Sequence, residues 1–539
     1  MNSLFLGAVN WYVSGAFIAY LVLMIGFGFF FAGKTNSLDD YYLGGRKMNK
    51  WVVALSAQAS DMSGWLLMGL PGAIYVAGFS EAWIGIGLGI GTYLNWKIVA
   101  HRLRQYSRVC RDSITIPDFF ANRFRDPIGI SRMIAALITL LFFTFYTASG
   151  FVSCAKLFSQ LFGMSYSTAL WIGALVVVSY TLLGGYSAVC WTDFVQGSLI
   201  FIAIVAVPAV ILFQAGGFTE SVAALNTAAS VKPYALLNLF TNAQTGEAVG
   251  LIGLISCLVW GLGYFGMPHI LVRFMSIENP AEVKGSRRIA MTWVFISLGA
   301  ATAIGLLGHI FLAKNGIALE DPEKLFLVMI ETIFSNSILL CILAGIFFSA
   351  VLAAIMSTAD SQLLVSASAF SNDIYKVVLR RKASERELVL VSRITVAAIA
   401  LISVLLSMNA ESEFFKVIMK MVSFAWGGFG ASFGPAILLS LFWRRTTLSG
   451  VVSGMVVGAA TCFVWKFVLA AKYAACCPIF NLYELAPGFL LSFLTIIVVS
   501  LLSKKPSDEI VAEFDLVNGL DEKVDAVAKS VTNELLEKH

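Results

Sequence analysis

Long apolar stretches recur along almost the whole chain, and short polar segments that hold most of the charges separate them. A helix needs about 20 apolar residues to cross a bilayer, and continuous rather than alternating apolar runs argue against a membrane β-barrel. The pattern predicts a single transmembrane domain over residues 1–503. We place thirteen spans at about 9–32, 51–77, 82–101, 132–160, 165–183, 193–214, 248–272, 289–313, 336–368, 389–408, 414–442, 448–470 and 485–503.

The composition agrees with an all-α polytopic membrane protein embedded in a lipid bilayer. Of the 539 residues, 58% are hydrophobic and 13% are charged, whereas a soluble protein has about 25% charged residues. The eight cysteines show no metal-ligand spacing. No nucleophile–base pair is evident either, so an enzyme is not expected.

Lysine and arginine predict the orientation of the spans. Of the 37 basic residues, 29 lie in alternate connecting segments or in the tail: 32–50, 97–132, 273–293, 371–393, 443–447 and from 504 onward. Basic residues concentrate on the cytoplasmic side, which predicts an outer N-terminus and an inner C-terminus. Beside so many spans, a nucleic-acid-binding surface is not expected. The cytoplasmic tail, 504–539, is acidic, and its apolar residues Ile510, Val511, Phe514 and Val517 predict a short surface helix or a partly ordered tail.

Three spans combine polar residues with helix-weakening residues at membrane depth. The second reads "AQASDMSGWLLMGLPG" over 57–72 and contains Asp61; the seventh reads "WGLGYFGMPHILVRF" from Trp260 to Phe274. The ninth reads "AGIFFSAVLAAIMSTADSQLLV" from Ala344 to Val365. This composition is expected of discontinuous helices, whose freed carbonyls bind cations and whose freed N–H groups bind anions. We therefore expect all three spans to be broken.

Other interpretations of these polar and aromatic residues stay open. Serine and threonine in membrane helices often donate to the carbonyl four residues earlier. Trp260 and Tyr264 fit interfacial aromatics, and Tyr146 fits ordinary packing. Asp61 is different, because an intramembrane carboxylate is costly and by default functional.

The second and seventh spans are five apart, which predicts two five-helix repeats over 51–214 and 248–442. Because five is odd, the second repeat would be inverted in the membrane relative to the first. Many secondary transporters are built in this way, with the substrate and the ion near the midplane where the repeats meet.

Longer motifs carry a resemblance to a known family. "ALSAQASDMSGWLLMGLPGA" (54–73), "YYLGGR" (41–46), "WGLGYFGMPHILVRFM" (260–275) and "AAIMSTADSQLLVSAS" (353–368) closely resemble the sodium:solute symporter family. The resemblance runs in order from the first span to the thirteenth. It implies the LeuT-type inverted-repeat fold, a bacterial inner-membrane location, and uptake of L-proline coupled to Na⁺. No obligate protein partner is expected.

The resemblance also implies the residues of the ion site. The family's Na⁺ ligands fall on the carbonyls of Ala59, Met62 and Ala354 and on the hydroxyls of Ser357 and Thr358. These are oxygen ligands, which suit a hard cation. The resemblance implies that Asp61 supports this site, either as a direct ligand or through the electric field of its carboxylate. We expect the cation and N–H groups of the broken helix to compensate its charge.

For the substrate, the resemblance implies contacts from two broken helices and the fourth span. A zwitterion with an apolar ring favours aromatic walls and a few polar groups. Arg46 matches a position implied in coupling and inner gating, although a plain positive-inside anchor fits it equally well. We also expect Trp260, Tyr264 and Pro268, four residues apart, to share one helical face. The implied substrate residues are Ser63, Gly69, Tyr146, Trp260, Tyr264 and Pro268.

Some members of the wider family bind a second Na⁺ further inward. The matching residues here are Asp193, Ser357, Asp360 and Ser361, which we interpret as a candidate second Na⁺ site or exit station. Alternatively, either aspartate caps a helix or faces the cytoplasm. Three rival functions stay open: a symporter of another small amino acid or a monocarboxylate, a membrane sensor, and a channel.

Overall fold

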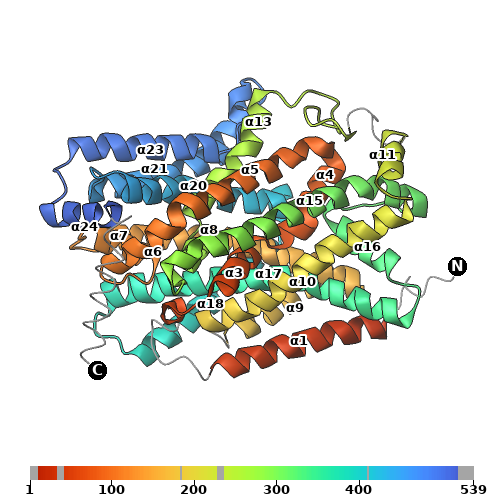
Figure 1. The fold of residues 1–539 in the computed structure, drawn as a ribbon, viewed down its shortest axis with the longest axis horizontal. Helices are drawn as coiled ribbons and strands as arrows, with labels where there is room; N and C mark the ends of the chain where they lie inside the picture. Colours follow the sequence, from red (N-terminus) through yellow and green to blue (C-terminus); the bar gives the residue numbers. More distant parts are fainter. Residues whose placement is uncertain (1–9, 33–41, 183–184, 228–235, 410–411, 520–539) are drawn as a thin grey trace.

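The computed structural model describes residues 10–32, 42–182, 185–227, 236–409 and 412–519. Within these ranges the protein is a helical bundle without β-strands; two isolated bridges are its only strand-like pairings. Most long helices run roughly along the longest axis of the molecule (Figure 1). The helices α7 and α24 lie at one end of that axis, and α11 lies toward the other.

The first half of the bundle begins with α1 (Trp11–Ala32) and contains a broken helix made of α3 and α4. Where an apolar run is uninterrupted, it forms one long helix, because every backbone polar group must be satisfied inside the membrane. The helices of this half are α3 (Lys50–Asp61), α4 (Leu70–Ala77), α5 (Ala82–Leu94), α6 (Ala100–Val109), α7 (Ile116–Arg123), α8 (Ile130–Phe162), α9 (Tyr166–Thr181), α10 (Tyr186–Gln214) and α11 (Phe218–Thr227).

The second half also opens with a broken helix. Its two parts are α13 (Leu251–Leu258), extended by the 3₁₀ segment η5 (Val259–Gly266), and α14 (Pro268–Ser276), which meet at an angle of 47°. The remaining helices are α15 (Val283–Asn315), α16 (Leu325–Ile333), α17 (Ile338–Ser368), α18 (Glu385–Ser407), α19 (Glu413–Lys416), α20 (Ile418–Phe442), α21 (Leu448–Val464), α22 (Ala471–Tyr473), α23 (Leu485–Leu502) and α24 (Asp508–Asn518).

The predicted breaks are confirmed in two spans and wrong in the third. The second span breaks after Asp61 and the seventh at Met267. The ninth span is one continuous helix, α17, which passes into a π-helical segment, η8 (Ala369–Leu379). Its hydroxyls donate to carbonyls three or four residues earlier, as Thr358 does to Ala354 and Ser361 to Ser357. This back-bonding satisfies the polar side chains without a break.

Length and hydropathy identify nine helices in the described residues that are able to span a membrane, or ten with the bent pair counted as one. Two shorter apolar helices, Trp11–Phe27 and Tyr166–Thr181, accompany them. The all-helical prediction is thus confirmed.

The predicted tail helix forms as α24, within the part of the tail that ends at residue 519. Ile510, Phe514 and Val517 are its buried residues, and the Phe514 ring packs edge-on against Tyr106 of α6. Residues 520–539 of the predicted tail lie outside the described residues.

Candidate functional site

The first broken helix places its free carbonyls against the middle of α17. Helix α3 stops at Asp61 because Met62 leaves the helical conformation, with φ −92° and ψ 81°. Gly64 then passes close to α8, where a Cβ atom would overlap the Ser153 hydroxyl. A glycine is therefore required for the chain to cross at this point.

Four of the five predicted Na⁺ ligands come together at this break. The Ser357 hydroxyl donates to the Ala59 carbonyl at 2.7 Å and lies 3.2 Å from the Ala354 carbonyl. The Thr358 hydroxyl approaches the same two carbonyls at 3.4 and 3.2 Å. All four residues are buried. Among the described contacts, the carbonyl of Met62, the fifth predicted ligand, takes no part in this set.

The cluster has the chemistry of a small, hard-cation site. It consists of two carbonyl and two hydroxyl oxygens with no nitrogen or sulfur, which suits alkali and alkaline-earth ions. The hydroxyls now satisfy the carbonyls by donating to them. A cation would accept lone pairs from the same four oxygens, with the hydroxyl protons rotated away.

Asp61 is fully buried beside this cluster, and its partner is a tyrosine. Its carboxylate accepts a 2.6 Å hydrogen bond from the Tyr264 hydroxyl, and its other oxygen has no hydrogen-bond partner among the described residues. The expected N–H groups of the broken helix are not its partners. Trp65 Nε1 instead donates to the Asp61 backbone carbonyl at 3.0 Å. A charged acceptor makes the Tyr264 bond stronger than a neutral one.

Three predicted substrate residues surround Asp61. Tyr264 contacts the carboxylate, and the Tyr146 hydroxyl lies 3.4 Å from the Asp61 carbonyl. Ser63 lies at the break itself and is 3% exposed. The three side chains supply aromatic walls and hydroxyls, which are the groups expected around a small zwitterion.

The other three predicted substrate residues lie at different depths. Gly69 lines a cavity of about 850 Å³ on the predicted outer side. The Trp260 ring lies tilted by 30° against the Tyr483 ring, with centroids 5.3 Å apart, and lines a separate outer cavity of about 430 Å³. Pro268 lines a narrow inner cavity of about 10 Å³. The predicted set therefore spreads along the molecule.

The prediction that Trp260, Tyr264 and Pro268 share one helical face is wrong. Residues 259–266 form a 3₁₀ helix, which turns every three residues rather than every 3.6, and the helix breaks before Pro268. Close approach to neighbouring helices accompanies this tight winding. A Cβ atom on Gly263 would overlap the indole of Trp426, whose Nε1 donates to the Trp260 carbonyl at 2.7 Å.

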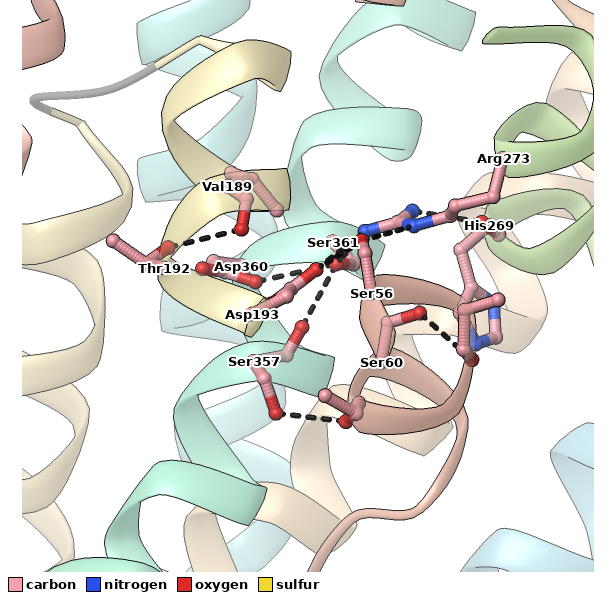
Figure 2. A network of polar contacts seen from close by, with 12 residues as sticks. Ser56, Ser60, Val189, Thr192, Asp193, His269, Arg273, Ser357, Asp360 and Ser361 are labelled. Atoms are coloured by element: carbon pink, nitrogen blue, oxygen red, sulfur yellow. Dashed lines mark hydrogen bonds and ion pairs between the residues drawn. The ribbon is translucent and has the colours of Figure 1, made fainter. Parts of the chain in front are cut away.

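The residues of the predicted second Na⁺ site gather around an arginine that the prediction did not include. The Arg273 guanidinium contacts Asp193 at 3.1 Å, the Ser361 hydroxyl at 2.5 Å and the Ser56 hydroxyl at 3.1 Å (Figure 2). Asp193 and Asp360 are both fully buried. Neither aspartate therefore faces the cytoplasm.

On the predicted inner side, Arg46 joins segments that are far apart in the sequence. It donates to the carbonyls of Met275 in α14 and Ser113 after α6, at 2.8 and 2.7 Å, and pairs with Asp112 at 2.9 Å. Arg46 is 8% exposed, so it is not only an interfacial anchor. Its position suits a latch across the inner end of the second broken helix.

On the predicted outer side, a buried ion pair that sequence reasoning missed borders the 850 Å³ cavity. Lys156 of α8 contacts Glu323 at 2.5 Å and Asp321 at 2.8 Å. Glu323 also accepts the backbone N–H groups of Ile418 and Met419 at the start of α20. A carboxylate at a helix N-terminus is favourable, so this cluster joins α8, α20 and the loop before α16.

Comparison with known proteins identifies the class. The family model described as the sodium:solute symporter family matches residues 41–458. A sodium/proline symporter of Salmonella typhimurium is 43% identical over 91% of this chain and 93% of its own length. The high-affinity proline transporter PutP of Bacillus subtilis is 45% identical over 91% of this chain and 98% of its own. The chain belongs to the sodium:solute symporter family. It is therefore a transporter and not an enzyme.

Solved structures agree on the fold. A substrate-bound, outward-open Na⁺-coupled sialic acid symporter has a TM-score of 0.74 at 19% identity, covering 93% of this chain and all of the other. MhsT, solved with L-phenylalanine, has a TM-score of 0.51 at 14% identity, covering 84% of this chain and 98% of its own. These likenesses establish a LeuT-like transporter fold.

Proposed function

We propose that this protein imports L-proline together with Na⁺ across the bacterial inner membrane by alternating access. The observation that carries the proposal is the oxygen cluster of Ala59, Ala354, Ser357 and Thr358 at a broken helix. The substrate is assigned from the relatives, which are named as proline transporters and cover more than nine-tenths of this chain. Na⁺ is the coupling ion, in keeping with the family.

Ion and substrate are coupled through the residues of the break. In the proposal, Na⁺ binds the four oxygens and the Met62 carbonyl, and Asp61 stabilises the ion through its charge. Tyr264 contacts that carboxylate and belongs to the second broken helix, so the ion site and the substrate site share a hydrogen bond. Binding of either solute then favours the other, by the same factor in both directions.

Proline is proposed to bind among Ser63, Tyr146 and Tyr264. Their rings and hydroxyls match its apolar ring and its polar groups. In this scheme Trp260 and Gly69 border the outer approach, and Pro268 borders the inner exit, as their cavities suggest. The six predicted substrate residues would then contact proline one after another along its path, and would not all surround it at a single site.

We further propose thirteen spans, with the N-terminus outside and the C-terminus inside. The 45-residue helical run Trp65–Val109 contains a 3₁₀ turn at Gly78–Glu81, which would divide it into two crossings. With this run counted as two crossings, the nine long apolar helices give ten. The bent pair and the two shorter apolar helices, Trp11–Phe27 and Tyr166–Thr181, bring the total to thirteen. The repeats 51–214 and 248–442 would then each begin with a broken helix, and residues 504–539 would lie in the cytoplasm.

The test is uptake of labelled L-proline into proteoliposomes with and without an inward Na⁺ gradient. We expect uptake that requires Na⁺ and that excess unlabelled proline abolishes. Competition with other small amino acids and with monocarboxylates tests the alternative substrates. If a monocarboxylate competes and unlabelled proline does not, the substrate assignment is wrong and the family assignment stands.

A further inference from the structure

A groove on the outside of the bundle lies between α3, α10 and α15. These three helices pack against one another, and where their outer faces meet they leave a cavity of about 480 Å³. That volume falls within the range of roughly 300–1,000 Å³ that is usual for ligand pockets. The apolar part of its lining consists of Trp51, Leu55, Phe201, Ile202, Ile289 and Trp293.

The groove offers apolar surface at a place where a membrane protein meets lipid. Trp51 is 54% exposed and Ile202 is 56% exposed, and both belong to predicted spans. The lining also contains two hydroxyls, those of Ser198 and Thr292. Each donates to the carbonyl four residues earlier in its own helix, so neither needs a polar ligand. An acyl chain therefore suits this surface.

Positive charge without a partner lies at the end of the groove on the predicted inner side. Arg288 is exposed and lines the groove. The Cδ atom of Lys50 lies 3.3 Å from where a Cβ atom on Gly285 would stand, one helical turn before Arg288. Within the described ranges neither cation forms an ion pair, and the acidic residues of the preceding loop, Glu278 and Glu282, pair with neither of them. An anion is therefore favoured at this end.

We propose that this groove binds one anionic phospholipid of the inner leaflet. Its acyl chain lies along Trp51 and Ile202, and its phosphodiester accepts hydrogen bonds from Arg288 and Lys50. Basic pockets between transmembrane helices on the cytoplasmic side suit anionic head groups, and tryptophan is common at the level of the head groups. Charge selects this lipid over a zwitterionic one, whose head group carries a positive charge of its own.

The floor of the groove connects this lipid site to the proposed Na⁺ site. Leu55 lies one helical turn before Ala59, whose carbonyl belongs to the oxygen cluster. Trp293 Nε1 donates to the carbonyl of Gly197 at 3.2 Å, and a Cβ atom on Gly197 would lie 3.2 Å from the Cβ of Ala59. A bound lipid thus supports α10 and α15 against the half-helix that carries the Ala59 carbonyl.

The experiment is native mass spectrometry of the purified full-length protein with equimolar phosphatidylglycerol and phosphatidylcholine. We expect the wild type to retain one phosphatidylglycerol in preference to phosphatidylcholine. Arg288→Gln should lower this preference about fivefold, which corresponds to about 1 kcal/mol per basic residue near a membrane surface. Arg288→Lys keeps the charge and should keep the preference. Thr292→Trp keeps both cations but fills the groove, and should also lower the retention of phosphatidylglycerol.

The matched control is Arg393→Gln, because Arg393 is exposed on α18 and does not line the groove. Loss of phosphatidylglycerol in Arg288→Gln and Thr292→Trp, with retention in Arg393→Gln, supports the proposal. Equal retention of the two lipids by the wild type overturns it, as does an equal loss in Arg393→Gln. If Thr292→Trp dissociates a dimer and leaves the lipid bound, the groove is covered by a second copy and the proposal is wrong. These lipid counts need no transport, so a failure of the proposed function leaves the test intact.

Discussion

The hydroxyl of Tyr264 donates a 2.6 Å hydrogen bond to the carboxylate of Asp61, and both residues are buried. This bond joins the first broken helix to the second at the depth of the proposed Na⁺ site, the oxygen cluster of Ala59, Ala354, Ser357 and Thr358. A rearrangement of either helix therefore changes the environment of the carboxylate. We regard this bond as the structural link between ion binding and substrate binding.

Asp61→Asn is expected to weaken Na⁺ binding by at least about tenfold, or ~1.4 kcal/mol, because it removes the charge that we propose stabilises the ion. Tyr264→Phe should weaken it less, and the two effects should not add, since the residues are in direct contact. The measurement is the Na⁺ dependence of thermal unfolding for the single and double variants. Ser60→Ala is the matched control, because that hydroxyl bonds within its own helix to Ala57. Additive effects would show that the bond does not couple the two residues.

Thr358→Val keeps the shape of the side chain but removes one of the four oxygens at the Na⁺ cluster. We expect a lower apparent Na⁺ affinity in proline uptake, with the maximal rate at saturating Na⁺ largely retained. Thr302→Val is a suitable control, because Thr302 only donates to Leu298 within α15. An unchanged Na⁺ dependence in Thr358→Val would remove Thr358 from the ligand set.

Gly263→Ala tests the close contact between the second broken helix and α20. The added Cβ would overlap the indole of Trp426, and overpacking of this kind costs about 1–3 kcal/mol. We expect a lower melting temperature in detergent. Gly299→Ala, in α15, has nothing within 4 Å of the added Cβ and should be neutral or stabilising, because alanine favours a helix by about 0.5–1 kcal/mol over glycine. Equal melting temperatures for the two variants would contradict the contact.

Arg46→Met should loosen the inner latch, because it removes the donors to the Met275 and Ser113 carbonyls. We expect a cysteine at Val365, which lines the inner cavity, to react faster with a maleimide in the Arg46→Met background. The measurement uses inside-out vesicles and a variant whose eight native cysteines are replaced. Equal labelling rates with and without the Arg46→Met substitution would count against the latch.

The sequence predicted the breaks of the second and seventh spans correctly, because helix-weakening and polar residues at membrane depth have a recognisable composition. Composition identified no Na⁺ ligands; the family resemblance implied them, and they stay a prediction. Sequence reasoning failed for Arg273 and Lys156. Arg273 follows an apolar run and begins a basic segment, so it resembled a cytoplasmic anchor, although the bend at Met267 turns α14 into the core. Lys156 resembled a scattered outer lysine, because its partners are 165 and 167 residues away. Periodicity and charge counting do not reveal such long-range ion pairs.

Lys156→Met should destabilise the outer cluster of Lys156, Asp321 and Glu323. Glu323 would keep its hydrogen bonds to the start of α20 but lose its buried cation. Breaking a buried ion pair costs about 3–5 kcal/mol, so the packing of α8, α20 and the loop before α16 against one another should become less stable and uptake should fall. A cysteine at Val76, which lines the outer cavity, should then react faster with a membrane-impermeant maleimide added from outside. The matched control is Lys420→Met, whose pair with Glu413 is exposed and is expected to contribute little, because solvent screens it. If both variants change labelling and uptake equally, the effect is one of surface charge and the outer cluster is not a gate.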